Sequence, residues 1–375
     1  MGTISKDSGI EKDENLVAVL MADDFEDKFT ILTQSKPKCL MTLANKEIID
    51  YSLEFLQSCK VQDCYVYCSN FVAEIKDHLF RTKWLSSYKG QNQMKRNNMN
   101  VIVISNENCH SFGDAMRDLD EKGVLRDHFL LTSADIICNS NLEPLIKEHR
   151  RRYLENKNSE LTIVYSRANP GHQSRSKDQE VLLLTEKDSN RIIYHTLAKD
   201  AFQDKSKNKT SATFPVEIFQ GKTMDEINIR YDLADSGIAI CSPSVPLQFS
   251  ERFDCQNLNE FIKGSIEDDL ADHFLYASVL GDNEQCNGYS GRVSDFMTYV
   301  SVTNDVINRW AYPFVPEATR TVTGKDVYSI SRHNVYKVSH NVHKLVVDVK
   351  LCPKLIIFSL FIIRIYCYLS FPTLI

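Results

Sequence analysis

"LVAVLMADDFEDKFTILTQSKPKCL" (residues 16–40) combines the features that decide the fold. Its first six residues are apolar throughout, as expected of a β-strand covered on both faces. The loop that follows contains four acidic residues and no glycine, and a Pro-Lys pair comes soon after it. A loop at this point of an α/β protein often cradles phosphate groups through backbone N–H groups that glycines bring close. An acidic loop without glycine is a poor match to that role.

Beyond this stretch, apolar strand-like runs alternate with amphipathic helical patterns. Strands are predicted at 16–21, 63–68, 101–105 and 127–136, and helices at 46–59, 71–79, 113–123 and 140–156. This alternation predicts an α/β protein with a doubly wound, mainly parallel Rossmann-like sheet. In such folds the ligand crevice lies outside the carboxyl ends of the strands, so the loop after Met21 and the loop that holds Asp135 open into it.

The second half of the chain is richer in strand patterns. Strands are predicted at 160–166, 180–185, 191–196 and 228–243, an exposed helix at 259–275, and a strand followed by a helix within 291–310. The helix at 140–156 is expected to have Ser140 or Asn141 as its N-cap, with Pro144 in the first turn.

The composition is that of an ordinary globular protein, with 43% hydrophobic and 25% charged residues. A net charge of −6 argues against direct binding of nucleic acid, which normally needs a basic excess. The 11 cysteines are scattered without metal-ligand spacing, so we expect buried, reduced thiols in a cytosolic protein and no metal site. No motif calls for a cofactor.

The C-terminal stretch "LIIFSLFIIRIYCYLSFPTLI" (355–375) is apolar almost throughout and interrupted by Arg364. It has about the length that a bilayer span requires, so hydropathy alone permits a membrane anchor. The alternative is a truncated or alternatively spliced product that ends in unrelated sequence.

Several longer stretches together resemble one family. They are "KPKCLMTLANKEIIDYSLEFL" (36–56), "SFGDAMRDLDEKGVLRDHFLLTSADII" (111–137), "RYDLADSGIAICSP" (230–243), "DVINRWAYPFVPEA" (305–318) and "SRHNVYK" (331–337). In this order they resemble the epsilon-subunit family of eukaryotic translation initiation factor two-B, a guanine-nucleotide exchange complex that acts on initiation factor two. The resemblance covers roughly residues 15–337 and implies a first domain of the nucleotidyltransferase (sugar-nucleotide pyrophosphorylase) type.

The family continues into a left-handed β-helix and a helical exchange domain, and the resemblance stops before both. The chain is therefore expected to divide into a flexible N-terminus (1–14), a nucleotidyltransferase-like domain (15–315), a linker at the start of the missing β-helix (316–350) and a divergent hydrophobic tail (351–375). The resemblance also implies pairing with the gamma subunit, then docking to the alpha, beta and delta subunits.

Active proteins of this fold carry a Gly-x-Gly-Thr-Arg loop where this chain has "ADDFEDKF" (22–29). We expect Asp23, Asp24, Glu26 and Asp27 to disable the loop, because carboxylates repel a triphosphate, and Lys28 offsets only part of that charge. By the resemblance, Lys38 matches the lysine that grips substrate phosphates and Asp135 matches an aspartate that holds Mg²⁺. Both also fit structural roles, as a solvated lysine and a loop or capping aspartate.

A second metal-holding aspartate is expected in a late strand, where the local alignment puts Tyr299. One carboxylate rarely organises a catalytic Mg²⁺, so no catalytic or metal-binding residue is predicted. The expected function is that of a catalytically silent scaffold subunit, which contributes to GDP/GTP exchange only in the full-length form. The alternative is an active sugar-nucleotide pyrophosphorylase.

Overall fold

The computed structural model describes residues 15–315, except 24, 26, 45, 83, 86–98, 169–171, 177, 202–213, 215–225, 269–272, 283–285 and 287. The expected N-terminal segment (1–14), linker (316–350) and tail (351–375) lie outside the described residues. Across the part of the chain that is described, no helix combines the length and the apolar character needed to cross a membrane.

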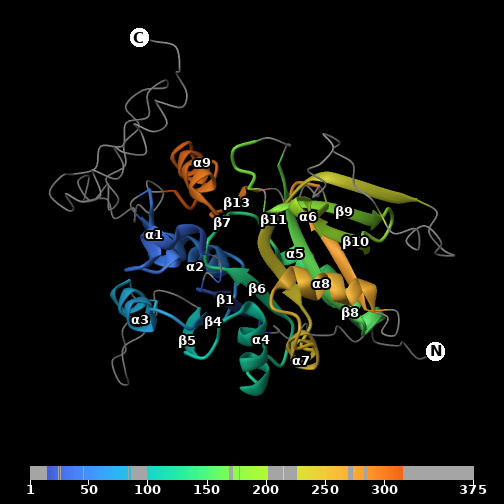
Figure 1. The fold of residues 1–375 in the computed structure, drawn as a ribbon, viewed down its shortest axis with the longest axis horizontal. Coiled ribbons are helices and arrows are strands. Elements are labelled where there is room, and N and C mark those ends of the chain that lie inside the picture. Colours follow the sequence, from blue (N-terminus) through green and yellow to red (C-terminus); the bar gives the residue numbers. More distant parts are fainter. Residues whose placement is uncertain are drawn as a thin grey trace, which may run out of the picture.

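A nine-stranded mixed sheet forms the centre of the described structure (Figure 1). Seven of its strands lie in the order β10-β9-β11-β6-β1-β4-β5. The other two extend the sheet from β11, because β8 pairs with β11 and β12 pairs with β8. Two small sheets, β13-β7 and β2-β3, lie apart from it. The strands span Val17–Met21 (β1), Thr42–Leu43 (β2), Lys46–Glu47 (β3), Asp63–Cys68 (β4), Asn100–Ser105 (β5), Phe129–Ser133 (β6), Ile136–Cys138 (β7), Ser159–Arg167 (β8), Glu180–Glu186 (β9), Ile192–Leu197 (β10), Ile227–Cys241 (β11), Phe274–Val279 (β12) and Ser290–Arg292 (β13).

The strands of the first half pair in parallel, as the alternation of strands and helices predicts. β1 lies between β4 and β6, with Val19 opposite Tyr65 on one side and Leu131 on the other, and β5 continues the sheet beyond β4. The predicted α/β class is confirmed, and the apolar run of β1 is explained by its central place, covered on both faces.

β11 carries the antiparallel part of the sheet. Its first residues pair with β9, and its last residues lie between β6 and β8. The register shifts between Asp235 and Ile238, where Gly237 adopts a φ of 72° and donates its N–H to the Asp235 carboxylate at 2.9 Å. This β-bulge frees the Asp235 side chain from the regular alternation of the strand.

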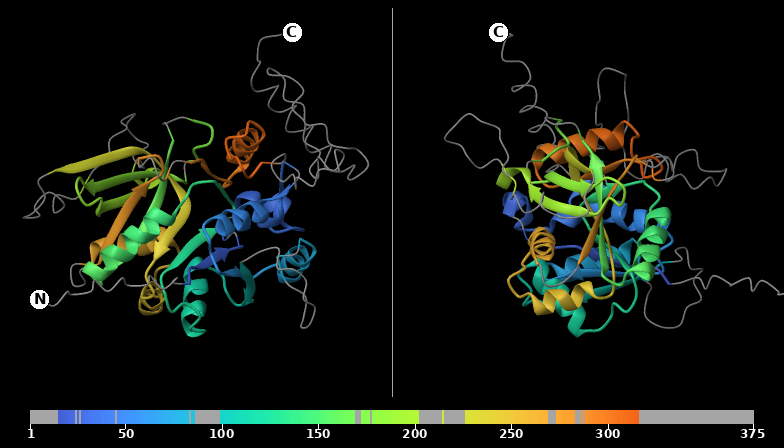
Figure 2. Two further views of the ribbon diagram at one scale, coloured as in Figure 1. Left: turned by 180° about the vertical axis from the view of Figure 1, so that it is seen from behind. Right: turned by 90° about the vertical axis from the view of Figure 1, so that its right-hand side faces the viewer.

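Helices cover both faces of the sheet, and each face has its own apolar core (Figure 2). The first core includes residues of α2, α3 and α5, and the second includes residues of α4, α7 and α8. Leu20 belongs to the first core and Val19 to the second, because successive side chains of a strand point to opposite faces. The helices span Thr30–Thr33 (α1), Ile48–Ser58 (α2), Val72–Arg81 (α3), Phe112–Glu121 (α4), Glu143–Glu155 (α5), Ala198–Ala201 (α6), Val245–Glu251 (α7), Leu258–Glu267 (α8) and Phe296–Ile307 (α9).

A third, smaller core lies under α9, which Figure 1 shows at the end of the molecule away from α4 and α7. Val302 and Val306 of α9 pack there with Phe29 and Ile48. The helix begins at a capping box, in which the Asp295 carboxylate accepts the Thr298 N–H at 2.8 Å. Because β13 directly precedes this cap and pairs with β7, α9 fixes the last residues of β13 against the loop that contains Asp135.

Two predictions about helix boundaries are wrong. The helix predicted at 259–275 ends at Glu267, and Phe274 begins β12, because these later residues pair in parallel with β8. The N-cap position of α5 is Leu142 rather than Ser140 or Asn141. The Asn141 side chain still accepts the Glu143 N–H at 3.0 Å, and Pro144 lies in the first turn as predicted.

Gly113 in the first turn of α4 provides a test of the second core. Its N–H donates to the Gln256 carbonyl at 3.0 Å, and a Cβ added here would clash with the backbone carbonyl of Cys255. Gly113→Ala is therefore expected to lower the free energy of unfolding by about 1–3 kcal/mol, measured by urea denaturation. The matched control is Gly264→Ala in α8, where the nearest atom lies 3.8 Å away, and it should leave stability unchanged or raised. Equal losses in both variants would contradict this packing.

Candidate functional site

Lys38 and Asp135 meet in the interior of the protein, as members of one site. Lys38 begins the short 3-10 turn Lys38–Leu40, and Asp135 lies between β6 and β7. The Lys38 Nζ atom lies 2.9 Å from Asp135 Oδ2, and the two side chains are only 4% and 6% exposed. The structure thus brings together the two residues that the resemblance singled out, as a buried ion pair.

Arg292 and Asp235 extend this pair into a network of four charges. The Arg292 Nε atom lies 3.2 Å from Asp135 Oδ1 and 3.3 Å from Oδ2, and Nη1 lies 3.2 Å from Asp235 Oδ2. The Val293 N–H donates to the Asp135 carbonyl at 2.9 Å, which holds the end of β13 in place. Two cations and two anions balance one another, and each buried charge has a partner of opposite sign.

The predicted position of Tyr299 is wrong. Tyr299 lies in α9, not in a late strand, and its hydroxyl donates to the Thr42 carbonyl. The late strand that approaches Asp135 is β13, and the residue it contributes is Arg292. A cation therefore occupies the place beside Asp135 where the resemblance called for a second metal-holding carboxylate.

The electrostatics of Asp135 follow from these neighbours. Burial alone would raise the pKa of the Asp135 carboxyl, but the Arg292 and Lys38 cations outweigh burial and hold that pKa well below its ordinary range. The carboxylate is therefore ionised at neutral pH, and both of its oxygens accept hydrogen bonds from Arg292 or Lys38.

A Mg²⁺ ion at this carboxylate would have to compete with those cations. Mg²⁺ demands near-octahedral oxygen ligands, and both oxygens of Asp135 already accept hydrogen bonds from cations. A divalent ion close to Arg292 would also be repelled by several kcal/mol at an effective dielectric of about 20. The residues present do not fit a magnesium site.

Asp23, in the loop after β1, has a structural role. The Asp23 carboxylate accepts the N–H groups of Ser69 and, at 3.3 Å, Asn70, in the connection between β4 and α3. Burial raises the pKa of Asp23, and these hydrogen bonds offset part of the effect. Asp24 and Glu26 lie outside the described residues, as does the side chain of Asp27, whose backbone begins the 3-10 turn Asp27–Phe29.

Lys28 links the first loop to the second half of the chain. Its Nζ atom lies 2.6 Å from Asp178 Oδ2. The Nζ atom of Lys199 lies 2.9 Å from Oδ1 of the same carboxylate. The structure pairs Lys28 with an acid about 150 residues away in the sequence. This contact ties the loop after β1 to the segment that leads into β9.

Nucleophilic chemistry by the described cysteines is not supported by their surroundings. All cysteines within the described ranges are buried and unbridged, as predicted for reduced thiols. Burial raises the pKa of the Cys68 thiol to about 12 and that of Cys138 to about 11, so both are neutral thiols at pH 7.

Solved structures of known function share this fold. A UDP-glucose pyrophosphorylase complexed with UDP-glucose superimposes with a TM-score of 0.52 at 14% identity, over 79% of this chain and 99% of the other. No protein-family model matches the chain. The chain therefore has the nucleotidyltransferase-like fold of the sugar-nucleotide pyrophosphorylases.

Two curated relatives narrow the identification. Translation initiation factor eIF2B subunit epsilon of Schizosaccharomyces pombe is 32% identical over 323 residues, which is 86% of this chain and 44% of that protein. The same subunit of Dictyostelium discoideum is 33% identical over 329 residues, 88% of this chain and 43% of that protein. The chain is a homologue of the eIF2B epsilon subunit, and it spans less than half the length of these relatives.

The sequence alone did not reveal Arg292 or Asp235 as site residues. Arg292 comes from a strand of three residues, too short for a periodic pattern, and it meets Asp135 across 157 positions of sequence. The one local signal for Asp235 is the Asp-Ser-Gly triplet at 235–237, which is typical of a bulge or turn.

Removal of the central acid should destabilise the fold. Asp135→Asn removes the carboxylate that balances the buried Lys38 cation and pairs with the partly buried Arg292, so we expect a loss of about 3–5 kcal/mol in the free energy of unfolding. The control is Asp77→Asn, which breaks the exposed pair with Arg81 and should leave the urea midpoint almost unchanged. Equal midpoints for Asp135→Asn and the wild type would contradict a network that stabilises the fold.

The pH dependence of that loss has a defined sign. Because the folded-state pKa of Asp135 is depressed, its contribution is complete above the unfolded pKa of about 3.9 and is lost as pH falls toward the folded value. The stability difference between wild type and Asp135→Asn should therefore stay constant from pH 7 to 5 and shrink from pH 4 to 2.5. Urea unfolding at these pH values measures it, and a difference that grows on acidification would contradict the assignment.

Proposed function

We propose that this chain is a catalytically silent, nucleotidyltransferase-like scaffold of the eIF2B guanine-nucleotide exchange complex. The observation that carries the proposal is the buried network in which Lys38 and Arg292 neutralise Asp135. The names of the two curated relatives support membership of the complex. In this role the fold supplies a rigid body for protein contacts, and the chain acts in the cytosol.

Catalytic silence follows from the chemistry that the site would need. Transfer of a nucleotidyl group requires metal ions and cationic groups to stabilise charge on the phosphates. Here Lys38 and Arg292 both compensate Asp135, the residue that the resemblance matches to a metal-holding aspartate. Neither Lys38 nor Asp135 is available without breaking a buried ion pair, so we propose both as vestigial residues with a structural role.

The acidic loop supports the same conclusion. Asp23 is engaged with the backbone of the β4–α3 connection, and Lys28 is engaged with Asp178. An active phosphate loop would present backbone N–H groups and cations to its ligand. We propose that "ADDFEDKF" (22–29) serves as a structural connection in which Asp24, Glu26 and Asp27 add to the repulsion of polyanions.

The proposed partners are the gamma subunit first, and then the alpha, beta and delta subunits. Four exposed apolar or aromatic side chains come from α9 and the segment after it: Phe296 (41% exposed), Met297 (53%), Trp310 (61%) and Tyr312 (63%). Apolar and aromatic groups of this kind form the centres of protein interfaces. We propose that this end of the molecule contributes to the contact with the gamma subunit, and that exchange on initiation factor two belongs to the full-length subunit.

Co-purification tests the scaffold role. The tagged full chain, co-expressed with the gamma subunit, should recover that subunit in a stable complex. Met297→Ser combined with Trp310→Ser should reduce recovery roughly tenfold or more, because exposed aromatic anchors dominate interface energy. Phe80→Ser, which removes an equally exposed side chain on α3, is the matched control and should have no effect. No recovery of the gamma subunit by the unmodified chain would contradict the scaffold role.

Activity assays separate the scaffold from the pyrophosphorylase alternative. The purified chain should form no sugar nucleotide from UTP or GTP and a sugar phosphate with Mg²⁺, and it should not accelerate GDP release from initiation factor two. Turnover that Asp135→Asn abolishes would favour the pyrophosphorylase, and rapid GDP release by the chain alone would contradict the assignment of exchange to the full-length subunit.

A further inference from the structure

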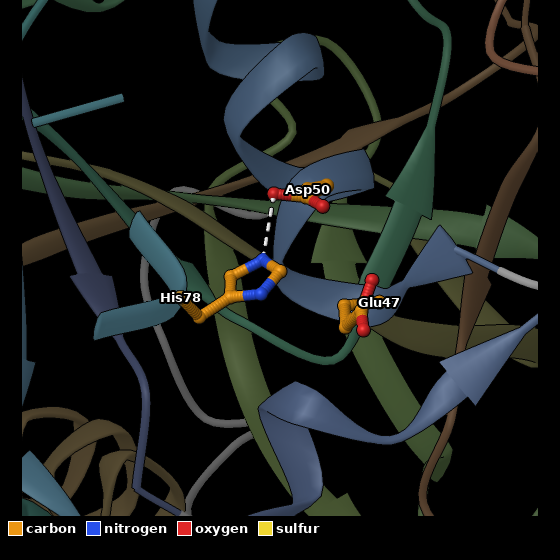
Figure 3. A group of neighbouring side chains, drawn as sticks. All are labelled: Glu47, Asp50 and His78. Atoms are coloured by element: carbon orange, nitrogen blue, oxygen red, sulfur yellow. Dashed lines mark hydrogen bonds and ion pairs between the residues drawn. The ribbon is translucent and has the colours of Figure 1, made fainter. Parts of the chain in front are cut away.

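A second cluster of ionisable side chains lies between α2 and α3, separate from the Asp135 network (Figure 3). Glu47 ends β3 and precedes α2, Asp50 lies in the first turn of α2, and His78 lies in the last turn of α3. One ligand atom from each residue lies within 4.8 Å of the others. Figure 3 shows the three side chains converging, with the imidazole of His78 directed to Asp50.

One pair of this cluster has nearly the spacing of two metal ligands. His78 Nε2 lies 3.2 Å from Asp50 Oδ1. Two ligands of a tetrahedral ion bound at about 2.0–2.1 Å are roughly 3.4 Å apart, so this pair needs a shift of a few tenths of an ångström, and the Glu47 carboxylate, within 4.8 Å, moves closer on binding. To bind an ion at Nε2, the neutral imidazole carries its one N–H on Nδ1, so the ion takes the place of the hydrogen bond between Nε2 and Asp50.

Trp84 already holds one ligand in place. Its indole Nε1–H donates to Asp50 Oδ1 at 3.1 Å, which fixes the orientation of the carboxylate. Hydrogen bonds of this kind to the ligands of a metal are a regular feature of metal sites. Asp50 and His78 are buried, with side chains 9% and 10% exposed, so their geometry is restricted by packing.

The charge and the donor atoms define the class of ion. Two carboxylates and a neutral imidazole carry a charge of about −2, which one divalent cation balances. A nitrogen ligand among oxygens is typical of zinc, cobalt or nickel, whereas Mg²⁺ and Ca²⁺ prefer oxygen throughout. We propose that Glu47, Asp50 and His78 form a binding site for a divalent transition-metal ion of the zinc type, which clamps α3 to the start of α2.

The consequence of such a clamp is local. α3 contributes Ile75 and Leu79 to the first core, and its last turn is joined to α2 through the His78–Asp50 contact. Three protein ligands leave one position for water, as in open zinc sites. The ion would therefore stabilise the docking of α3 and remain accessible to exchange.

The fluorescence of Trp84 provides a direct test in the full chain. The sequence contains two tryptophans, so Trp310→Phe leaves Trp84 as the one indole emitter. Titration of this variant with Co²⁺ should quench the emission saturably, and Zn²⁺ should compete with Co²⁺ at one equivalent per chain. His78→Gln in the same background should weaken the affinity roughly tenfold or more. His172→Gln, which removes an exposed histidine elsewhere, is the matched control and should leave the titration unchanged.

A second ligand variant keeps the proposal testable if the first variant does not fold. If circular dichroism shows that His78→Gln does not fold, Glu47→Gln replaces it, because this half-buried side chain keeps its volume and loses its charge. It should also weaken the affinity for Co²⁺. Absence of saturable quenching up to about 1 mM Co²⁺, or an affinity that none of the ligand variants changes, would overturn the proposal.

Discussion

The ion pairs of Asp135 join side chains from segments that are far apart in the sequence and add to the backbone pairing of β13 with β7 and of β11 with β6. Lys38 comes from the turn before β2, Asp235 from the bulge in β11, and Arg292 from the end of β13. Buried charges are tolerated only with partners of opposite sign, so each of these segments must reach its place for the others to be stable. The carboxyl end of β6 is thereby enclosed by four compensated charges.

The same network is the physical basis of the scaffold role that we propose for this nucleotidyltransferase-like fold. In a catalytic site, some charged side chains have no partner within the protein. Solvent compensates their charge before the substrate and the metal bind, and these ligands compensate it afterwards. At Asp135 the protein supplies the compensation itself, through Arg292 and Lys38. The chain keeps the shape of the pyrophosphorylases at 14% identity while its homology is to an eIF2B subunit. The proposed scaffold role keeps the fold without its chemistry, because function resides in a few side chains.

Much of the fold follows from local patterns that the sequence displays. The strands at 63–68 and 101–105 and the helix with Ile75 and Leu79 on one face were predictable, because buried parallel strands and amphipathic helices have distinct periods. The end of α8 was not predictable, since pairing of β12 with β8 overrides the helical pattern there. Lys38 and Asp135 were found through the resemblance. Arg292 was missed because its partner is distant in sequence, and Tyr299 was placed wrongly because a short strand gives no register.

Calorimetric titration of the full chain with UTP or GTP in the presence of Mg²⁺ tests the proposed loss of phosphate chemistry most directly. With Lys38 and Arg292 engaged by Asp135, we expect no saturable heat at micromolar to millimolar nucleotide. Saturable binding at micromolar concentration, dependent on Mg²⁺ and abolished by Asp135→Asn, would mean that nucleotide and metal displace the buried ion pairs and that the site is still a nucleotide site.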